Sequence, residues 1–317
     1  MLAGKTFLIT GATGRLGCAT VARLEALHAT VFPLILPGYP PAPKRASWDA
    51  RTSPLAVRDT GDLEKLPRPD YVINYHWLVD RGRSFTGQIV YELDRNVHRV
   101  SFLWAWLREK SFTRFVNISS VKVFSGASEG PVRADTEPRP GSAYGIAKVA
   151  AEKFLDAYFS KSGGSVIHLR LGSVACLLGH PSSLMSRLCD SAFRQCRIRI
   201  NAGHATCLIH IDEAVDLIIN AALTASERYY IVAMPPERNE CIADEFERVS
   251  GLRLNADRVD CEPGEAEPVL VSNASMLEAD WTRRMSLTSA LQAIVDSYRR
   301  AHPIWCGASI DGACASL

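Results

Sequence analysis

A glycine-rich turn near the start of the chain constrains its fold more than any other feature. An apolar run at residues 7–9 leads directly into residues 10–17, where Gly11, Gly14 and Gly17 stand three residues apart, and a helix-like segment follows. Glycines at this spacing let the backbone approach a pyrophosphate, whose charge then lies at the N-terminus of the helix. The turn therefore predicts the first strand and helix of an α/β fold that binds a dinucleotide at the edge of its sheet.

Strand-like and helix-like segments alternate through the first half of the chain, which is typical of a parallel sheet with helices on both faces. Predicted strands lie at residues 6–10, 30–36, 55–57, 71–75, 115–119 and 166–171, and predicted helices at 15–27, 92–110 and 143–161. Later helices are expected at 184–196, 212–224, 242–250 and 287–300. The fold class predicted is α/β, a Rossmann-type doubly wound parallel sheet with a smaller C-terminal substrate lobe.

The weaker alternation in the second half suggests a division into two domains. We expect a dinucleotide-binding domain at residues 1–172 and a substrate-binding lobe at residues 173–303. The end of the chain is rich in small residues, so we expect residues 304–317 to form a poorly ordered tail.

A second motif consists of Tyr144 and Lys148, four residues apart in a helix-like segment. Both side chains then leave the same face of the helix, one turn apart. A tyrosine beside an ammonium is suited to moving a proton. Each motif alone is a weak signal, but the glycine turn followed at this distance by the Tyr144 and Lys148 pair is a strong one.

With these motifs the chain resembles an extended short-chain dehydrogenase/reductase, within the NAD-dependent epimerase/dehydratase family. The resemblance runs from about Lys5 to about Arg300 and includes further matching segments at Asn96-Val97, residues 115–120, Arg170 and residues 210–213. It implies a nicotinamide dinucleotide cofactor and hydride transfer, with Tyr144 as acid/base. The substrate implied is a small molecule such as a nucleotide sugar.

The resemblance also implies which residues contact the cofactor. Asp59 matches a residue that hydrogen-bonds the adenine amino group, and Lys148 matches one that binds the nicotinamide ribose. The full set expected at the cofactor is Gly11, Thr13, Gly14, Arg15, Leu16, Gly17, Asp59, Thr60, Asn74, Asn96, Tyr144 and Lys148.

The end of the second predicted strand bears on the choice between NAD and NADP. An acid there would accept both ribose hydroxyls of NAD, but residues 34–37 contain none. Lys44, Arg45 or Arg15 would be able to reach a 2′-phosphate, unless the two loop residues are solvated surface charges. We therefore expect NADP, with NAD as the alternative.

The catalytic residues implied are Ser120, Tyr144 and Lys148, with Ser119 as the alternative hydroxyl that polarises the substrate oxygen. The pKa of a tyrosine is about 10, so a base at neutral pH needs it lowered by about 3, equivalent to about 4 kcal/mol. One ammonium about 4 Å away supplies about 4 kcal/mol at an effective dielectric of 20. We expect Lys148 to have this effect on Tyr144.

The residue at one position bears on the type of reaction. Lys122 stands where the dehydratases of the family carry a glutamate, and a cation is a poor base at neutral pH. Dehydration is therefore disfavoured, which leaves keto reduction or epimerisation. Cys176 and His180 invite a comparison with epimerising reductases, although a buried cysteine is more often structural.

The substrate is less well defined. Thr206-Cys207 replaces an arginine that usually holds the substrate diphosphate, and the acidic segment 262–267 surrounds the place of a second. Three other arginines are candidates to replace them, namely Arg187, Arg194 and Arg197. The alternatives are a small carbonyl or alcohol substrate, or a non-catalytic protein that binds NADP. His76 and Trp77 replace small residues near the cofactor ribose, and their roles stay open, as do those of Lys122, Cys176 and His180.

Composition limits the partners and the location. The chain has 36 basic and 34 acidic residues, and the basic ones are scattered, so we expect no nucleic acid partner. No apolar run reaches the roughly 18 residues of a membrane span, so we expect no membrane partner and a cytoplasmic location. The 9 cysteines form no CxxC pair, so we expect no metal. A homodimer is expected from the resemblance.

Overall fold

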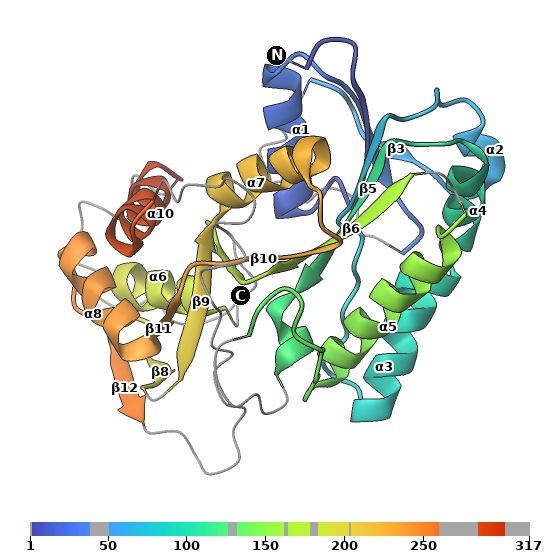
Figure 1. The fold of residues 1–317 in the computed structure, drawn as a ribbon. Coiled ribbons are helices and arrows are strands. Elements are labelled where there is room, and N and C mark those ends of the chain that lie inside the picture. Colours follow the sequence, from blue (N-terminus) through green and yellow to red (C-terminus); the bar gives the residue numbers. More distant parts are fainter. Residues whose placement is uncertain are drawn as a thin grey trace.

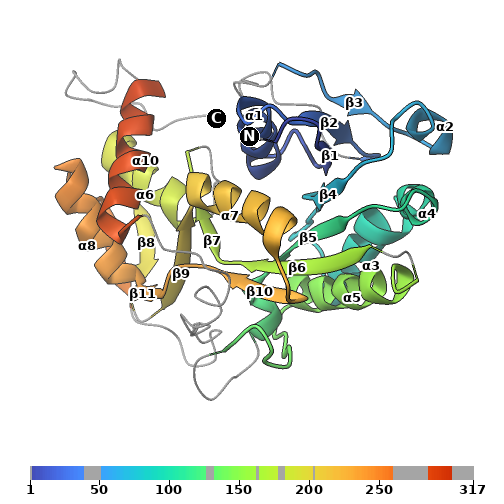
Figure 2. The ribbon, with the colours of Figure 1, turned by 45° about the horizontal axis from the view of Figure 1, so that its top comes forward.

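The computed structural model describes residues 2–38, 51–125, 132–161, 164–177, 183–202, 204–259 and 285–301. Its main layer is a seven-stranded parallel sheet in the order β10-β6-β5-β4-β1-β2-β3 (Figures 1 and 2). The strands are β1 (Thr6–Thr10), β2 (Thr30–Ile35), β3 (Leu55–Ala56), β4 (Tyr71–Asn74), β5 (Arg114–Ser120), β6 (Ser165–Leu171) and β10 (Tyr229–Val232). The order from β3 to β6 is that of a doubly wound dinucleotide-binding sheet, which confirms the predicted fold class.

Helices cover both faces of this sheet, as Figure 2 shows. One face is covered by α1 (Arg15–Ala26) and α7 (Ile211–Thr224), and the other by α2 (Thr60–Leu63), α3 (Phe85–Leu93), α4 (Ser101–Glu109) and α5 (Ala143–Tyr158). Alternate residues of each strand point to opposite faces, so Phe7 and Ile9 pack under α1 while Leu8 packs under α4. Both faces therefore contribute a continuous apolar core.

The face under α5 also carries a buried row of polar side chains that crosses four strands. Thr10, Asn74, Asn117 and His168 are neighbours in strand register. The Thr10 hydroxyl donates to Asn74 (2.6 Å), Asn74 donates to Asn117 (3.1 Å), and the Asn117 amide lies 3.1 Å from Nδ1 of His168. His168 Nε2 lies 3.1 Å from Asp156 on α5. Each buried group thus has a partner, which avoids the cost of an unpaired one.

The predicted helix at residues 92–110 is wrong in its extent. Ser84 caps α3 by accepting a hydrogen bond from the Gly87 amide, so the helix begins earlier than expected. A π-helical turn, η1 (Asp94–His98), then separates α3 from α4. This turn places Asn96 beside Leu78, whose amide and carbonyl it binds at 2.6 and 2.9 Å.

The second lobe contains a three-stranded sheet and a strand pair. The sheet is formed by β7 (Ser173–Ala175), β9 (Ala205–His210) and β11 (Pro236–Arg238), and the pair by β8 (Ile198–Asn201) and β12 (Ala256–Val259). Its helices are α6 (Leu184–Arg194), α8 (Asn239–Ser250) and α10 (Leu287–Ala301), which enclose a separate apolar core (Figure 1).

The expected domain boundary at residue 172 does not separate the two units, because the chain returns to the main sheet. β10 pairs with β6, and α7 packs beside α1, although both follow residue 172. The two units therefore alternate along the chain after β6. The tail expected at residues 304–317 lies outside the described residues.

Two further findings concern the described part of the chain. No described helix is long and apolar enough to cross a membrane. Among the same residues, no cluster of three or more histidine, cysteine, aspartate or glutamate side chains is arranged to hold a metal ion.

Candidate active site

A cavity of about 400 Å³ opens at the carboxyl edge of the main sheet, where β1, β4, β5 and β6 end. It brings together the glycine turn, the start of α5 and the segment after β6. Its lining residues are Gly11, Gly14, Arg15, Leu16, Gly17, Tyr75, Trp77, Arg81, Ile118, Ser119, Ser120, Tyr144, Lys148, Leu171, Gly172, Ser173, Val174, Cys176 and Ser183. The two sequence motifs, more than 120 residues apart, therefore meet in one cavity.

The geometry of the glycine turn fits a pyrophosphate. Gly11 has φ +60°, and a Cβ on Gly17 would lie 2.4 Å from the Gly11 carbonyl oxygen, so neither position accepts a larger residue without a shift. No side chain in the described chain caps α1 at Gly14, and its first turn carries no acid. The amides that begin α1 are therefore available to an anionic ligand, which the helix dipole favours.

Only part of the predicted cofactor set lines this cavity: Gly11, Gly14, Arg15, Leu16, Gly17, Tyr144 and Lys148. Thr13 is buried beside the cavity, and Asp59 caps α2, accepting from the Gly61 amide at 2.8 Å. Thr60 is the first residue of α2.

Asn74 belongs to the polar row, and Asn96 holds the Leu78 backbone. Cofactor contacts by Thr13, Asp59, Thr60, Asn74 and Asn96 stay predictions, because none of these residues lines the cavity.

The proposed catalytic residues come from two elements that pack closely. Ser120 ends β5 and caps the 3₁₀ turn η2 (Val121–Phe124), while Ser142 caps α5 and so places Tyr144 in its first turn. The Ser120 hydroxyl hydrogen-bonds the Tyr144 side chain. A Cβ on Gly145 would lie 2.4 Å from the Lys122 carbonyl oxygen, so the glycine permits this close approach.

The electrostatics of Tyr144 and Lys148 differ from the sequence prediction. Burial raises the pKa of Tyr144 to about 12, although the hydrogen bond from Ser120 and the charge of Arg81 act in the opposite direction. Burial also lowers the pKa of Lys148 to about 7, against the opposing effect of Glu92 and Glu152. Lys148 is not among the groups that shift the pKa of Tyr144 in this arrangement, where burial has the largest effect on both residues, so the expected lowering by Lys148 stays a prediction.

The Lys148 ammonium lies against the ring of Trp77. Lys148 Nζ donates to the Ile118 carbonyl at 2.9 Å and lies 3.6 Å from the centre of the Trp77 ring. The Trp77 indole donates to Glu92 at 2.8 Å, and Gln88 donates to the other oxygen of the same carboxylate at 2.6 Å. Trp77 also meets the Tyr144 ring edge to face at 6.3 Å.

Sequence reasoning missed Glu92, Gln88 and Arg81. Glu92 is fully buried, and Arg81 lines the cavity. The one available signal for Glu92 is its place in the otherwise apolar segment 89–93, where a buried acid needs a partner.

His76 is buried behind the cavity, where its amide donates to Thr10 at 3.3 Å and its ring Nε2 lies 3.2 Å from the Arg95 carbonyl oxygen. Burial lowers its pKa to about 4. The bulky residue at this position therefore fills space under the cavity as a neutral side chain.

The remaining candidate residues differ in whether they line the cavity. Cys176 lines the cavity and hydrogen-bonds Arg15, and burial raises the pKa of its thiol, so the thiolate that a nucleophile needs is disfavoured. Ser119 also lines the cavity, and its buried hydroxyl has no hydrogen-bond partner among the described residues. Lys122 is exposed and does not line the cavity, and His180 lies outside the described residues.

The three arginines considered for a substrate diphosphate are engaged within the second lobe. Arg187 donates to the Arg199 carbonyl at 2.7 Å, while Arg194 pairs with Asp190 and Arg197 with Asp257. None of the three lines the cavity. The arginines that do line it are Arg15 and Arg81.

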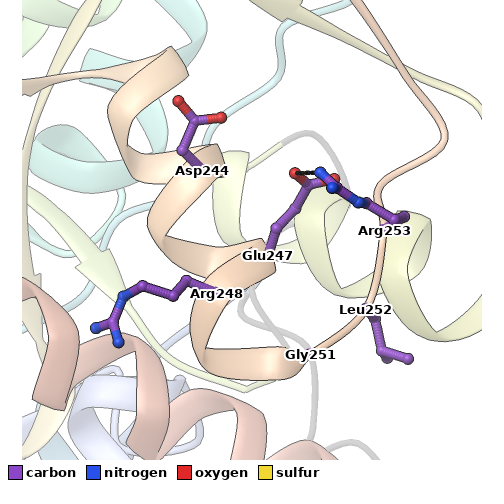
Figure 3. Close-up of a pocket in the computed structure, with 6 residues that line it drawn as sticks. All are labelled: Asp244, Glu247, Arg248, Gly251, Leu252 and Arg253. Carbon is purple, nitrogen blue, oxygen red and sulfur yellow. Dashed lines mark hydrogen bonds and ion pairs between the residues drawn. The ribbon is translucent and has the colours of Figure 1, made fainter.

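A second hollow lies at the end of α8, away from these residues (Figure 3). It is lined by Asp244, Glu247, Arg248, Gly251, Leu252 and Arg253. Its charged groups pair with near neighbours, as Arg253 does with Glu247 at 3.1 Å and Arg248 with Glu245. It therefore offers no convergent chemistry comparable to the first cavity.

Comparisons with solved structures agree with the fold. The UDP-glucose 4-epimerase of Thermotoga maritima superposes with a TM-score of 0.81 at 17% identity, covering 93% of this chain and 99% of that one. The UDP-glucose 4-epimerase of Thermus thermophilus, solved with NAD, gives 0.78 at 18% identity, covering 93% and 99%. The dTDP-glucose 4,6-dehydratase of Bacillus anthracis, also solved with NAD, gives 0.78 at 15% identity, covering 95% and 98%.

A comparison with curated protein sequences finds no match. The family model described as "NAD dependent epimerase/dehydratase family" matches residues 7–231, from the first strand through β10. This match spans most of the chain and includes the glycine turn, Ser120, Tyr144 and Lys148. The chain therefore belongs to the NAD-dependent epimerase/dehydratase family of extended short-chain dehydrogenases/reductases.

Proposed function

We propose that this protein is an oxidoreductase dependent on NAD or NADP, which reduces a keto group or epimerises a hydroxyl carbon on a nucleotide sugar or a sugar-like substrate. The observation that carries the proposal is the meeting of the glycine turn with Ser120, Tyr144 and Lys148 in one cavity. A nicotinamide cofactor supplies the hydride in such a reaction.

The protein's own residues manage the proton. The phenol of Tyr144, protonated at neutral pH because burial raises its pKa, donates to the oxygen of a carbonyl as it gains negative charge. Ser120, which hydrogen-bonds Tyr144, is placed to hold the same oxygen. In the oxidative direction the Tyr144 phenolate takes the proton back from the substrate hydroxyl, and the nearby charge of Arg81 favours that phenolate.

The lining of the cavity supports reduction or epimerisation over dehydration. An elimination needs a base beside the ketone, yet none of the described lining residues is an aspartate or a glutamate. The position where dehydratases of the family carry a glutamate is the exposed Lys122. A dehydratase would have to obtain its base from outside the described lining.

Product mass tests the reaction. We expect purified protein, incubated with nucleotide-activated hexoses and reduced or oxidised cofactor, to give an isomer of unchanged mass or a product with two added hydrogens. A product lighter by one water, formed without net change in the cofactor, would contradict the proposal. Turnover of small carbonyl compounds alone would support the second candidate substrate class, which the absence of Arg187, Arg194 and Arg197 from the cavity favours.

We further propose NADP as the preferred cofactor, with NAD as the alternative. β2 ends in apolar residues, and Leu36 beyond it is buried, so no carboxylate there repels a 2′-phosphate. Lys44 and Arg45, which would attract it, lie outside the described residues. Fluorescence titration should give a lower Kd for NADPH than for NADH, and tighter binding of NADH would overturn the preference.

A homodimer through α3 is also proposed. Phe85 and Val90 on this helix are large apolar residues with exposed fractions of 56% and 62%, and α3 packs against α5. Exposed large apolar side chains favour association with another surface. Light scattering should report a dimer for the parent protein and a monomer for Val90→Asp; a monomeric parent would contradict the proposal.

A further inference from the structure

The Trp77 indole covers the buried ammonium of Lys148. The distance of 3.6 Å from Nζ to the ring centre is that of a direct cation–π contact, and both side chains line the cavity. Lys148 is 3% exposed, so most of its surface is already in contact with protein. Among the described residues, its ammonium donates a hydrogen bond to the Ile118 carbonyl oxygen. The face of the indole ring thus occupies a position beside the ammonium that a hydrogen-bond acceptor could otherwise fill.

A hydrogen bond to a buried carboxylate holds Trp77 in this position. Its Nε1 donates to Glu92 at 2.8 Å, and Gln88 fixes the other carboxylate oxygen at 2.6 Å. Glu92 is fully buried on α3, so the bond is shielded from water. The next residue, Leu78, is bound at both its amide and its carbonyl by Asn96. The indole therefore has a defined place over Lys148.

A bound dinucleotide would meet this pair. With its pyrophosphate at the start of α1 and its reactive ring near Tyr144, the proposed cofactor places a ribose between these two points of the cavity. The ribose hydroxyls are hydrogen-bonding groups, and Lys148 is the one lysine among the described lining residues. The buried hydroxyl of Ser119, which has no hydrogen-bond partner among the described residues, lines the same cavity and is available to a polar group of a ligand.

We propose that Trp77 is a specificity-determining residue that competes with the ribose nearest the nicotinamide for Lys148, so that it weakens binding of the complete cofactor but not of ADP. The proposal rests on the proposed function, because it needs a dinucleotide in this cavity. The indole must leave the ammonium before the ribose can bind it, and this displacement lowers the affinity for the cofactor.

Calorimetric titration of matched variants tests the proposal, with ADP as a probe that lacks the second ribose. We expect Trp77→Ala to bind NADH or NADPH about 10-fold more tightly than the parent, because the competing cation–π contact is lost. Trp77→Phe keeps a ring but loses the bond to Glu92, so we expect an intermediate gain. The Kd for ADP should stay within about two-fold in all variants, because the pyrophosphate site is unchanged.

Val79→Ala serves as the control, because Val79 lies in the same segment, is exposed, and does not line the cavity. It should bind both ligands as the parent does. Circular dichroism checks that each variant is folded. If Trp77→Ala does not fold, the binding measured for Trp77→Phe decides the test. A second readout is indole emission: the parent should respond to NADH and much less to ADP, and Trp77→Phe should lose most of that difference.

The outcomes separate this proposal from the proposed function. Unchanged or weaker binding of NADH and NADPH by both Trp77 variants overturns it, and weaker binding would make the indole a support for the cofactor. In either case binding of the cofactor by the parent protein leaves the proposed function intact. A folded parent and folded variants that bind neither ADP nor either cofactor overturn both.

Discussion

The two ends of the cavity are built in different ways. At the glycine turn, backbone contacts fix the geometry, since a Cβ on Gly17 would lie 2.4 Å from one backbone oxygen and 2.8 Å from the Ala12 Cα. At the Lys148 end, the geometry depends on side chains that bind one another, with Trp77 between Lys148 and Glu92. In the proposed function the first end is a preformed pyrophosphate site, whereas the second end needs a movement of Trp77 before the ribose binds. The proposal therefore assigns preserved binding to the backbone constraints and its adjustment to the side chains at the other end.

The largest effect is expected at the glycine turn. Gly17→Ala forces the start of α1 away from the turn, because the obstructing atoms belong to the backbone. We expect cofactor binding to be lost and the free energy of unfolding to fall by about 3 kcal/mol, as in other overpacked sites. Gly82→Ala is the control, since its nearest heavy atom would be a side-chain oxygen at 3.4 Å. Wild-type binding by Gly17→Ala would show that the turn is not the pyrophosphate site.

A smaller but still large effect is expected from Tyr144→Phe, which removes the proton donor and leaves the ring in place. Turnover should fall on the order of 10²-fold or more, while the Kd of the cofactor stays nearly unchanged. Steady-state kinetics and titration of the same preparation measure the two quantities. Near-normal turnover would show that another residue is the acid/base.

A third effect concerns pH and sharpens the contrast at the Lys148 end. Burial lowers the pKa of Lys148 from 10.5 to about 7, so between these values the unfolded chain binds a proton that the folded chain lacks. Stability from this group therefore rises as pH increases from about 7 to about 10. Lys148→Met should reduce that rise in urea unfolding curves measured across this range. An identical slope in both proteins would place the ammonium in contact with water.

The sequence predicted the glycine-turn end better than the Lys148 end for a physical reason. Gly11, Gly14 and Gly17 are required by local backbone geometry, and the four-residue spacing of Tyr144 and Lys148 follows from helix periodicity. Glu92 gave no such signal, because a glutamate on a helix is usually exposed and its burial depends on Trp77, 15 residues earlier.

The return of β10 and α7 to the main sheet was missed for a similar reason. The short strand Tyr229–Val232 follows a helix in the second half of the chain, and its place beside β6 comes from long-range pairing that no local pattern encodes. The polar row has the same origin, since its members are 43 to 64 residues apart.

The hydrogen bonds of the buried polar row under α5 all run in the same direction from donor to acceptor. The Thr10 hydroxyl donates to Asn74, Asn74 to Asn117, and Asn117 to Nδ1 of His168, which leaves Nε2 as the nitrogen that carries hydrogen toward Asp156. Every amide in the row is thereby oriented by its neighbour, and one ring tautomer is selected from three strands away. Nitrogen chemical shifts of the His168 ring would report that tautomer directly.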